Sequence, residues 1–108
     1  IVREPDGLAM SSRNKYLATA QRQAALVLSR SLERAASLLA AGERDSALIL
    51  AAVRELIDQQ PLAEIDYVSL VDPLSLAAIE RVEQQALLAL AVKFGKTRLI
   101  DNMLWEAK

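Results

Sequence analysis

Two stretches in the first half of the chain place apolar residues at the spacing of an amphipathic helix. In the first, from about residue 20 to 41, apolar positions recur three and four residues apart, with Thr19 as the expected N-cap and Gly42 just past the end. In the second, Asp45 can cap a helix that Pro61 ends, since the residue before a proline avoids helical dihedral angles. Because only a short Gly-Glu-Arg link separates them, the two helices are predicted to pack as an antiparallel hairpin.

The second half carries the shorter apolar runs of strands. The run EIDYVSLVD, residues 64–72, is expected to place Ile65, Tyr67 and Val71 on one face and Val68 and Leu70 on the other. Two further runs are separated by Phe94-Gly95-Lys96, which is a hairpin signal. The first of them is apolar on both faces from 87 to 92, so it is expected at the centre of the sheet and covered on both sides. The stretch from 74 to 85 fits either a short helical turn or a strand-like link.

These elements predict an α+β fold, in which a helix hairpin packs on a small, mostly antiparallel three-stranded sheet. The chain has 108 residues, 53% of them hydrophobic and 25% charged, as expected for one globular domain. With 13 basic and 14 acidic residues the net charge is −1, which excludes a whole-surface attraction to nucleic acid. No apolar run approaches the roughly 20 residues of a membrane-spanning helix.

Two missing residue types each remove a class of chemistry. Without cysteine, the chain has no disulfide, thiolate metal site or cysteine nucleophile. Without histidine, it also lacks the commonest general base and the commonest metal ligand. Asp66 and Asp72 flank one predicted strand, but six residues of strand hold them about 20 Å apart, too far to share an ion. No metal site is therefore predicted.

The candidate chemistry lies in DGLAMSSRN, residues 6–14. The hydroxyls of Ser11 and Ser12 and successive backbone N–H groups can converge on phosphate oxygens, above all if Ser12 to Asn14 begin a helical turn. Arg13 adds a planar guanidinium that binds two oxygens together. The same residues also fit a capping turn with a solvated arginine, and the spacing alone favours that second interpretation.

Two segments resemble a known enzyme family. IVREPDGLAMSSRNKYL at the start of the chain resembles the opening of the C-terminal domain of pantothenate synthetase, the pantoate–β-alanine ligase, and GKTRLIDN at 95–102 resembles the end of that domain. The helix hairpin and DYVSLVDP lie between them in the family's order and spacing. The resemblance implies a hinge and ATP-phosphate loop at 1–18 and a lid domain at 19–108. The chain starts without methionine, and we expect an N-terminal Rossmann-like domain to be missing from it.

The resemblance also implies a mechanism and a set of site residues. In that family, ATP and pantoate give pantoyl adenylate and pyrophosphate, and β-alanine then gives pantothenate and AMP. Met10 to Arg13 match the counterpart of the KMSKS loop of class I aminoacyl-tRNA synthetases, with Arg13 where those enzymes have lysine. By this resemblance Ser11, Ser12 and Arg13 hold the ATP phosphates as catalytic groups, while Val2 and Met10 contact the adenine through their backbone. Mg²⁺ is expected to be bound mainly by the nucleotide phosphates.

The same resemblance implies a cytoplasmic enzyme with ATP, pantoate and β-alanine as its ligands. It implies a homodimer formed through the N-terminal domain, and activity only in the full-length chain. The alternative is a protein-interaction module with no catalytic role, which would use an exposed face to bind a protein partner.

Five further side chains receive structural interpretations. Lys15 lies next to the phosphate loop but is interpreted as a solvated lysine. Arg98 and Asp101 are interpreted as a structural ion pair or cap at the end of the hairpin. Tyr67 and Trp105 are interpreted as core or edge packing residues, and not as platforms for a base.

Overall fold

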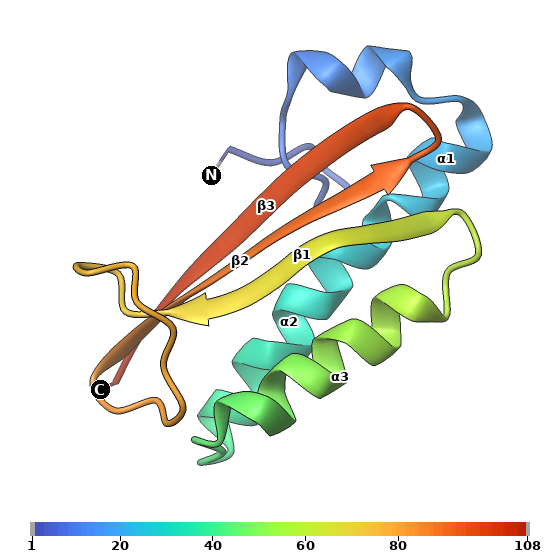
Figure 1. Cartoon of the computed structure of the whole chain (residues 1–108). Helices are drawn as coiled ribbons and strands as arrows, with labels where there is room; N and C mark the ends of the chain where they lie inside the picture. Colours follow the sequence, from blue (N-terminus) through green and yellow to red (C-terminus); the bar gives the residue numbers. More distant parts are fainter. Residues whose placement is uncertain (1, 108) are drawn as a thin grey trace.

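The computed structural model describes residues 2–107 and arranges them in two layers (Figure 1). Ile1, where the expected hinge begins, and Lys108, where the expected lid domain ends, lie outside the described residues. The elements in chain order are the 3₁₀-helix η1 (Ser12–Tyr16), the helices α1 (Thr19–Ala24), α2 (Leu26–Ala40) and α3 (Ser46–Asp58), and the strands β1 (Ala63–Val71), β2 (Gln85–Phe94) and β3 (Thr97–Glu106).

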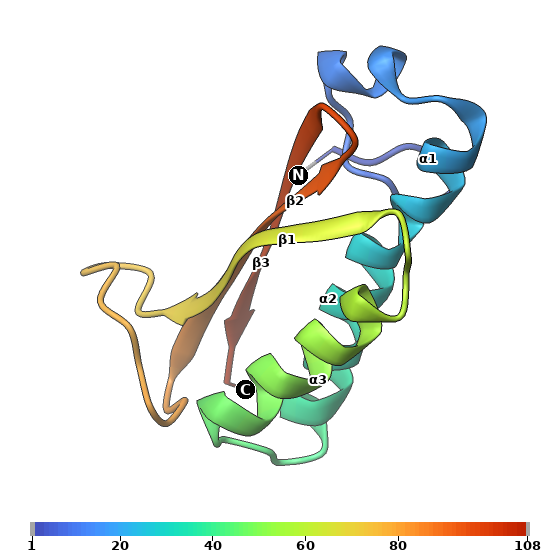
Figure 2. The ribbon, with the colours of Figure 1, turned by 45° about the vertical axis from the view of Figure 1, so that its right-hand side comes forward.

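One layer is a three-stranded sheet in the order β1-β2-β3, and both neighbouring pairs are antiparallel. The other layer is the pair α2 and α3, which runs antiparallel and packs on one face of the sheet (Figure 2). The predicted α+β fold is therefore confirmed. Within residues 2–107, no helix combines the length and the apolarity that crossing a membrane requires.

The first predicted helix is divided in the structure, and its expected cap was wrong. Thr19 is the first residue of α1, and no side chain caps the first turn; the N–H of the preceding Ala18 donates to Oε1 of Gln21 at 3.0 Å. At Ala25 the dihedral angles stay helical, but the Leu28 N–H bonds to the Ala25 carbonyl, one residue short of the α-helical spacing. Apolar periodicity continues across this tightened turn, so the sequence pattern could not reveal it.

The link between α2 and α3 follows the prediction closely. Gly42 adopts a φ of +101° after the last turn of α2. Its N–H donates to the Leu39 carbonyl, and the Glu43 N–H donates to the Leu38 carbonyl. These two bonds form a Schellman motif, which requires a left-handed residue at the position of Gly42. Asp45 then caps α3 by accepting from the Ala47 N–H at 2.9 Å.

β2 lies at the centre of the sheet, as predicted, but only part of it is covered on both faces. Its helix-facing side chains Leu88, Leu90 and Val92 are fully buried in the core. On the opposite face Ala91 is fully buried, whereas Leu87 and Ala89 stay half-buried, because no helix in residues 2–107 covers that face (Figure 2). In the part of the chain that the structure describes, the predicted second cover is therefore confirmed at Ala91 and wrong at Leu87 and Ala89.

The predicted faces of β1 were wrong at Ile65. A bulge between Ile65 and Tyr67 shifts the register against β2. Since one extra residue reverses the alternation of side chains, Ile65 packs against the core on the same side as Val68 and Leu70, whereas Tyr67 is exposed.

The stretch after β1 combines the two predicted alternatives: one helix-like turn, in which the Leu76 N–H donates to the Asp72 carbonyl at 2.8 Å, and then a strand-like link. A turn at 73–75 is followed by two isolated bridges, which pair Ala78 with Val71 and Arg81 with Asp45. In Figure 1 this connection projects from the body beyond the end of β1, in yellow and orange.

Candidate functional site

Residues 2–10, called the N-terminal turn below, form a short hairpin-like turn. The Glu4 N–H donates to the Leu8 carbonyl at 2.7 Å, and the Met10 N–H donates to the Val2 carbonyl at 2.8 Å. Leu8 is only 2% exposed and belongs to the core. At the apex, Gly7 has a φ of +99°, and a Cβ there would lie 2.9 Å from Oγ of Ser29 on α2. The turn is therefore packed tightly against the helical layer.

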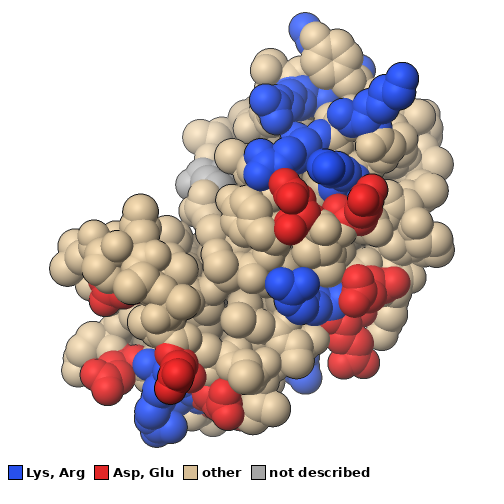
Figure 3. All heavy atoms as spheres, viewed as in Figure 1, with Lys and Arg blue, Asp and Glu red and all other residues tan. Residues whose placement is uncertain are grey.

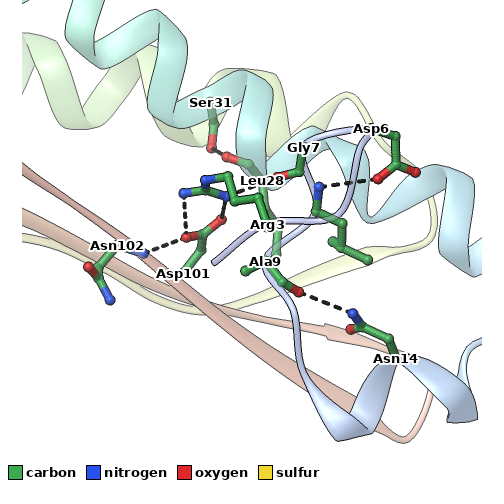
Figure 4. Close-up of polar contacts among 10 residues, drawn as sticks. Arg3, Asp6, Gly7, Ala9, Asn14, Leu28, Ser31, Asp101 and Asn102 are labelled. Carbon is green, nitrogen blue, oxygen red and sulfur yellow. Dashed lines mark hydrogen bonds and ion pairs between the residues drawn. The ribbon is translucent and has the colours of Figure 1, made fainter. Parts of the chain in front are cut away.

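A bidentate ion pair joins this turn to β3 (Figure 4). The Arg3 guanidinium donates to both oxygens of Asp101, at 2.8 and 2.9 Å, and also to the Gly7 carbonyl at 3.0 Å. The Asp101 side chain is 1% exposed and accepts the Asn102 N–H as well. The hydrogen bond to Asp101 raises the pKa of Arg3 above its ordinary value.

The predicted pair between Arg98 and Asp101 was therefore wrong. Arg98 Nε instead donates to Oδ2 of Asp66 on β1 at 2.7 Å. Residues 98 and 101 are three positions apart on one strand, so their side chains point to opposite faces of the sheet. Side chains on opposite faces of the sheet cannot form an ion pair, so the alternation alone excludes a contact between Arg98 and Asp101.

A second ion pair fixes the turn to α1. Arg22 donates to the carboxylate of Asp6 at 3.0 Å, and the same carboxylate accepts the Leu8 N–H at 3.3 Å. The hydrogen bond from Arg22 lowers the pKa of Asp6. Together with Arg3, this pair ties the N-terminal turn to both layers of the fold.

Ser12 to Asn14 do begin a helical turn, η1, and the turn also has the cap and the exposed arginine of the alternative interpretation. Ser11 has extended dihedral angles and caps η1: its Oγ accepts the Arg13 N–H, and its carbonyl accepts the Asn14 N–H, both at 3.1 Å. Two of the N–H groups expected to be free for phosphate are thus used within the turn. The Ser11 hydroxyl keeps its own proton to donate. Within residues 2–107 the Ser12 hydroxyl forms no hydrogen bond.

Arg13 and Asn14 connect η1 to its surroundings. Nη1 of Arg13 donates to the Arg98 carbonyl at 3.2 Å at an exposed position, which lays the side chain along the start of β3. Nδ2 of Asn14 donates to the Ala9 carbonyl at 3.1 Å, returning to the N-terminal turn (Figure 4). Lys15 lies on the exposed side of η1, with its ammonium group 5.2 Å from the centre of the Tyr16 ring.

A groove of about 450 Å³ lies between these segments and β3. Apolar side chains line it from the N-terminal turn, α2 and β3: Leu8, Ala9, Met10, Leu28, Leu99 and Ile100. Polar residues line the rest: Ser11, Arg13, Asn14, Arg98 and Asn102. A shallow hollow next to it is lined by Arg13, Lys96 and Arg98, among others. Figure 3 shows Lys and Arg gathering at this end of the molecule, so the groove is apolar inside and basic at its rim.

The structure brings together most of the residues that the sequence analysis proposed, but not all. Met10, Ser11 and Arg13 line one groove. Ser12 and Val2 do not line it, and the Val2 side chain is 71% exposed. The Met10 N–H and the Val2 carbonyl bond to each other, so these two backbone groups are already paired.

The aromatic candidates lie outside the groove. Trp105 is half-buried against the core, with the Arg44 guanidinium 4.6 Å above its ring, which confirms it as a packing residue. Tyr67 lies at the exposed face of β1, where Arg98 is 5.8 Å from its ring. In residues 2–107, no three histidine, cysteine or acidic side chains gather as they would around a metal ion.

Sequence reasoning missed the residues that hold the site in place. Arg3, Asp101 and Asn14 each lie inside a segment that the sequence analysis singled out, IVREPDGLAMSSRNKYL or GKTRLIDN. The available signal was that an arginine and an aspartate stand in the two segments that resemble one family. Their partners lie up to 98 positions away, and no local pattern connects them.

Comparisons with known proteins agree on one family. The family model described as Pantoate-beta-alanine ligase matches residues 1–104. The chain is similar to a pantothenate synthetase of Heliobacterium modesticaldum, with 57% identity over 98% of this chain and 38% of that protein. It is 55% identical to one of Pelotomaculum thermopropionicum over 95% of this chain and 36% of that protein. The crystal structure of pantothenate synthetase from Thermus thermophilus matches with a TM-score of 0.88 and 37% identity, over 94% of this chain and 37% of that one.

Proposed function

Because this chain belongs to the pantoate-beta-alanine ligase family, we propose that it is the ATP-binding lid of a longer enzyme. That enzyme joins pantoate to β-alanine through a pantoyl adenylate, releasing pyrophosphate and AMP. The observation that carries the proposal is the single groove shared by Met10, Ser11 and Arg13, apolar inside and basic at its rim. The chain spans 38% of the length of the first of these relatives. We propose that the pantoate and β-alanine sites belong to the remaining part of the enzyme.

Arg13 is the group that binds the phosphates in this proposal. Its guanidinium has five N–H donors, and the bond from Nη1 to the Arg98 carbonyl uses one of them. The other N–H groups can bind phosphate oxygens while that carbonyl holds the side chain in position. A fixed cation beside the α-phosphate stabilises the negative charge that develops as the adenylate forms and pyrophosphate departs.

Ser11 has two roles in the same turn. Its Oγ accepts the Arg13 N–H and so shapes the backbone on which Arg13 stands. The hydroxyl proton remains free to donate to a phosphate oxygen. Ser12 has a hydroxyl without a partner in residues 2–107, but a contact between it and the nucleotide requires η1 to turn toward the groove.

The apolar part of the groove suits the base of the nucleotide. Met10 and Ile100 line the groove and are both more than half exposed, so they offer apolar contact to an adenine ring. We propose that the Mg²⁺ ion that neutralises the triphosphate is bound mainly by the nucleotide phosphates.

The groove supplies ligands from one side only, so catalysis needs the remaining part of the protein. We infer that this chain closes over ATP held by that part, and that the 108 residues alone are inactive. Membership of the family also leads us to propose a cytoplasmic homodimer whose contacts lie outside this chain.

The test is Arg13→Ala in the full-length parent enzyme. Pantoate-dependent exchange of pyrophosphate into ATP should fall by about 100- to 1000-fold, because a charge-stabilising donor is lost. The melting temperature should change little, since the Arg13 side chain is exposed. Lys15→Ala is the matched control, because it removes a neighbouring exposed cation of η1 and should leave the exchange near the parent value.

Unchanged exchange in Arg13→Ala, or an equal loss in Lys15→Ala, would refute the assignment of Arg13. A parent protein without any ATP-dependent formation of pantothenate would favour the alternative, a protein-interaction module.

A further inference from the structure

The two segments that resemble the ligase family meet in one ion pair, and this pair has a use beyond holding the fold. We propose that Arg3 and Asp101 are positioning residues: their bidentate pair fixes the N-terminal turn on β3 and thereby sets where Met10 to Arg13 stand for ATP. The inference rests on the proposed function, since it concerns the placement of the same phosphate-binding groups.

The geometry of the pair controls orientation as well as distance. Two parallel N–H···O bonds, at 2.8 and 2.9 Å, allow the guanidinium and the carboxylate only one relative orientation. A third bond from Arg3 holds the Gly7 carbonyl, and Asp101 is itself held by the Asn102 N–H. Arg3 is therefore connected at once to the apex of the turn and to the strand beneath it.

Hydrogen bonds link the position of the N-terminal turn to that of the phosphate-binding residues. On one side of them, the Met10 N–H bonds to the Val2 carbonyl, next to Arg3 in the chain. On the other side, Asn14 bonds to the Ala9 carbonyl, and Ala9 is paired with Arg3 across the turn. Ser11 to Arg13 are thus held between two points that both depend on the placement of Arg3.

Stability alone does not account for this pair. The Asp101 side chain is 1% exposed and the Arg3 side chain 32%, so burial of the carboxylate costs desolvation that offsets part of what the ion pair contributes. Leu8 already anchors the turn through the hydrophobic effect, which is strong but has no direction. The ion pair fixes the orientation of the N-terminal turn, which the apolar contacts of Leu8 do not.

The experiment uses Asp101→Asn in the full-length parent enzyme. Asparagine keeps the size of the side chain and removes its charge, so Arg3 loses its bidentate partner. We expect the KM for ATP to rise about 10-fold in pyrophosphate exchange, as one charged hydrogen-bonded contact is lost. The KM for β-alanine in the second step should remain within about 2-fold, since the groove holds none of its ligands in this proposal.

The matched control is Val53→Ala, a fully buried position on α3 away from the N-terminal turn. It should lower the melting temperature as much as Asp101→Asn does, and leave the KM for ATP unchanged. A rise in the KM for ATP that is equal in the two variants would overturn the inference, because the pair would then act only through stability.

Arg3→Lys provides a second measurement if Asp101→Asn fails to fold. Lysine keeps the charge but not the fork, so we expect the KM for ATP to rise a few-fold with the melting temperature close to that of the parent. An unchanged KM for ATP in Arg3→Lys would overturn the inference. Arg13→Ala is measured beside these variants: if it impairs exchange while Asp101→Asn and Arg3→Lys do not, only the inference fails. If Arg13→Ala is also silent, the proposed function fails.

Discussion

Two irregular segments of this molecule share structural features but are held in different ways. The first is the N-terminal turn with η1, and the second is the connection at 72–84 between β1 and β2. Both expose large apolar side chains: Met10 is 53% exposed in the first, and Leu74 is 86% exposed in the second. Both contain a residue with positive φ, namely Gly7 and Leu76.

The first segment and the tip of the second, residues 72–77, differ in where their hydrogen-bond partners come from, although residues 80–82 of the second pair with residues 44–46. The first segment is tied to residues far away in the sequence, through Arg3 with Asp101 and Arg13 with Arg98. The tip of the second closes on itself: Asp72 Oδ1 accepts the N–H groups of Leu74 and Ser75, at 2.8 and 3.0 Å. We infer that the conformation of the first segment is fixed for a purpose, while the tip of the second needs only to connect two strands.

Leu8→Ala tests this difference with the largest expected effect. Leu8 is buried in the core, so its truncation should lower the free energy of unfolding by about 2–4 kcal/mol, through lost transfer energy and the cavity that remains. Leu74→Ala in the exposed tip is the matched control and should change it by less than about 0.5 kcal/mol. Urea unfolding of the 108-residue chain measures both. Equal losses would remove the distinction between the two segments.

Substituting asparagine at the two positions with positive φ, Gly7 and Leu76, compares the two segments through smaller changes in the free energy of unfolding. Leu76 has a φ of 61° and is exposed, so Leu76→Asn should stabilise the chain by about 0.5 kcal/mol, because asparagine tolerates this conformation better than leucine. Gly7→Asn should destabilise it by about 1–3 kcal/mol, because the new Cβ meets Oγ of Ser29 at 2.9 Å. Chemical denaturation measures the sign of the change in the free energy of unfolding for each variant. Two changes of the same sign would contradict this account.

The parts of the fold that sequence reasoning predicted are those fixed by neighbouring residues. The Asp45 cap, the left-handed Gly42 and the turn after Phe94 each depend on a few adjacent positions, and the structure has all three. The tightened turn at Ala25 was missed because apolar periodicity continues through it, and the bulge after Ile65 because Tyr67 extends the alternation that Ile65 begins.

In the candidate site, too, local contacts could be predicted from the sequence and long-range contacts could not. The capped turn formed by Ser11 is local, and the sequence predicted it. The bond from Arg13 to Arg98 and the pair of Arg3 with Asp101 join positions 85 and 98 residues apart, which only the folded sheet brings together. Their absence from the sequence prediction follows from this separation, and so does the mistaken pairing of Arg98 with Asp101.

The smallest expected effect concerns the charge of Asp72 in the projecting connection. Hydrogen bonds from the backbone N–H groups of Ser75 and Leu74 lower the pKa of Asp72 below its ordinary value of 3.8. A lowered folded-state pKa means that the unfolded chain binds the proton more readily, so this carboxylate stabilises the fold above that ordinary value. The contribution is lost as the pH falls through the lower, folded-state pKa.

Asp72→Asn therefore should lower the melting temperature slightly at neutral pH, and the difference from the unmodified chain should disappear in acid, where Asp72 is protonated and resembles asparagine. Thermal unfolding of both chains from about pH 7 down to about pH 2 measures this convergence. Asp66→Asn serves as the control, since Asp66 binds the distant Arg98 and not its own turn. A difference between Asp72→Asn and the unmodified chain that stays constant down to the acid end would mean that the tip is shaped by the geometry of the side chain alone, and not by its charge.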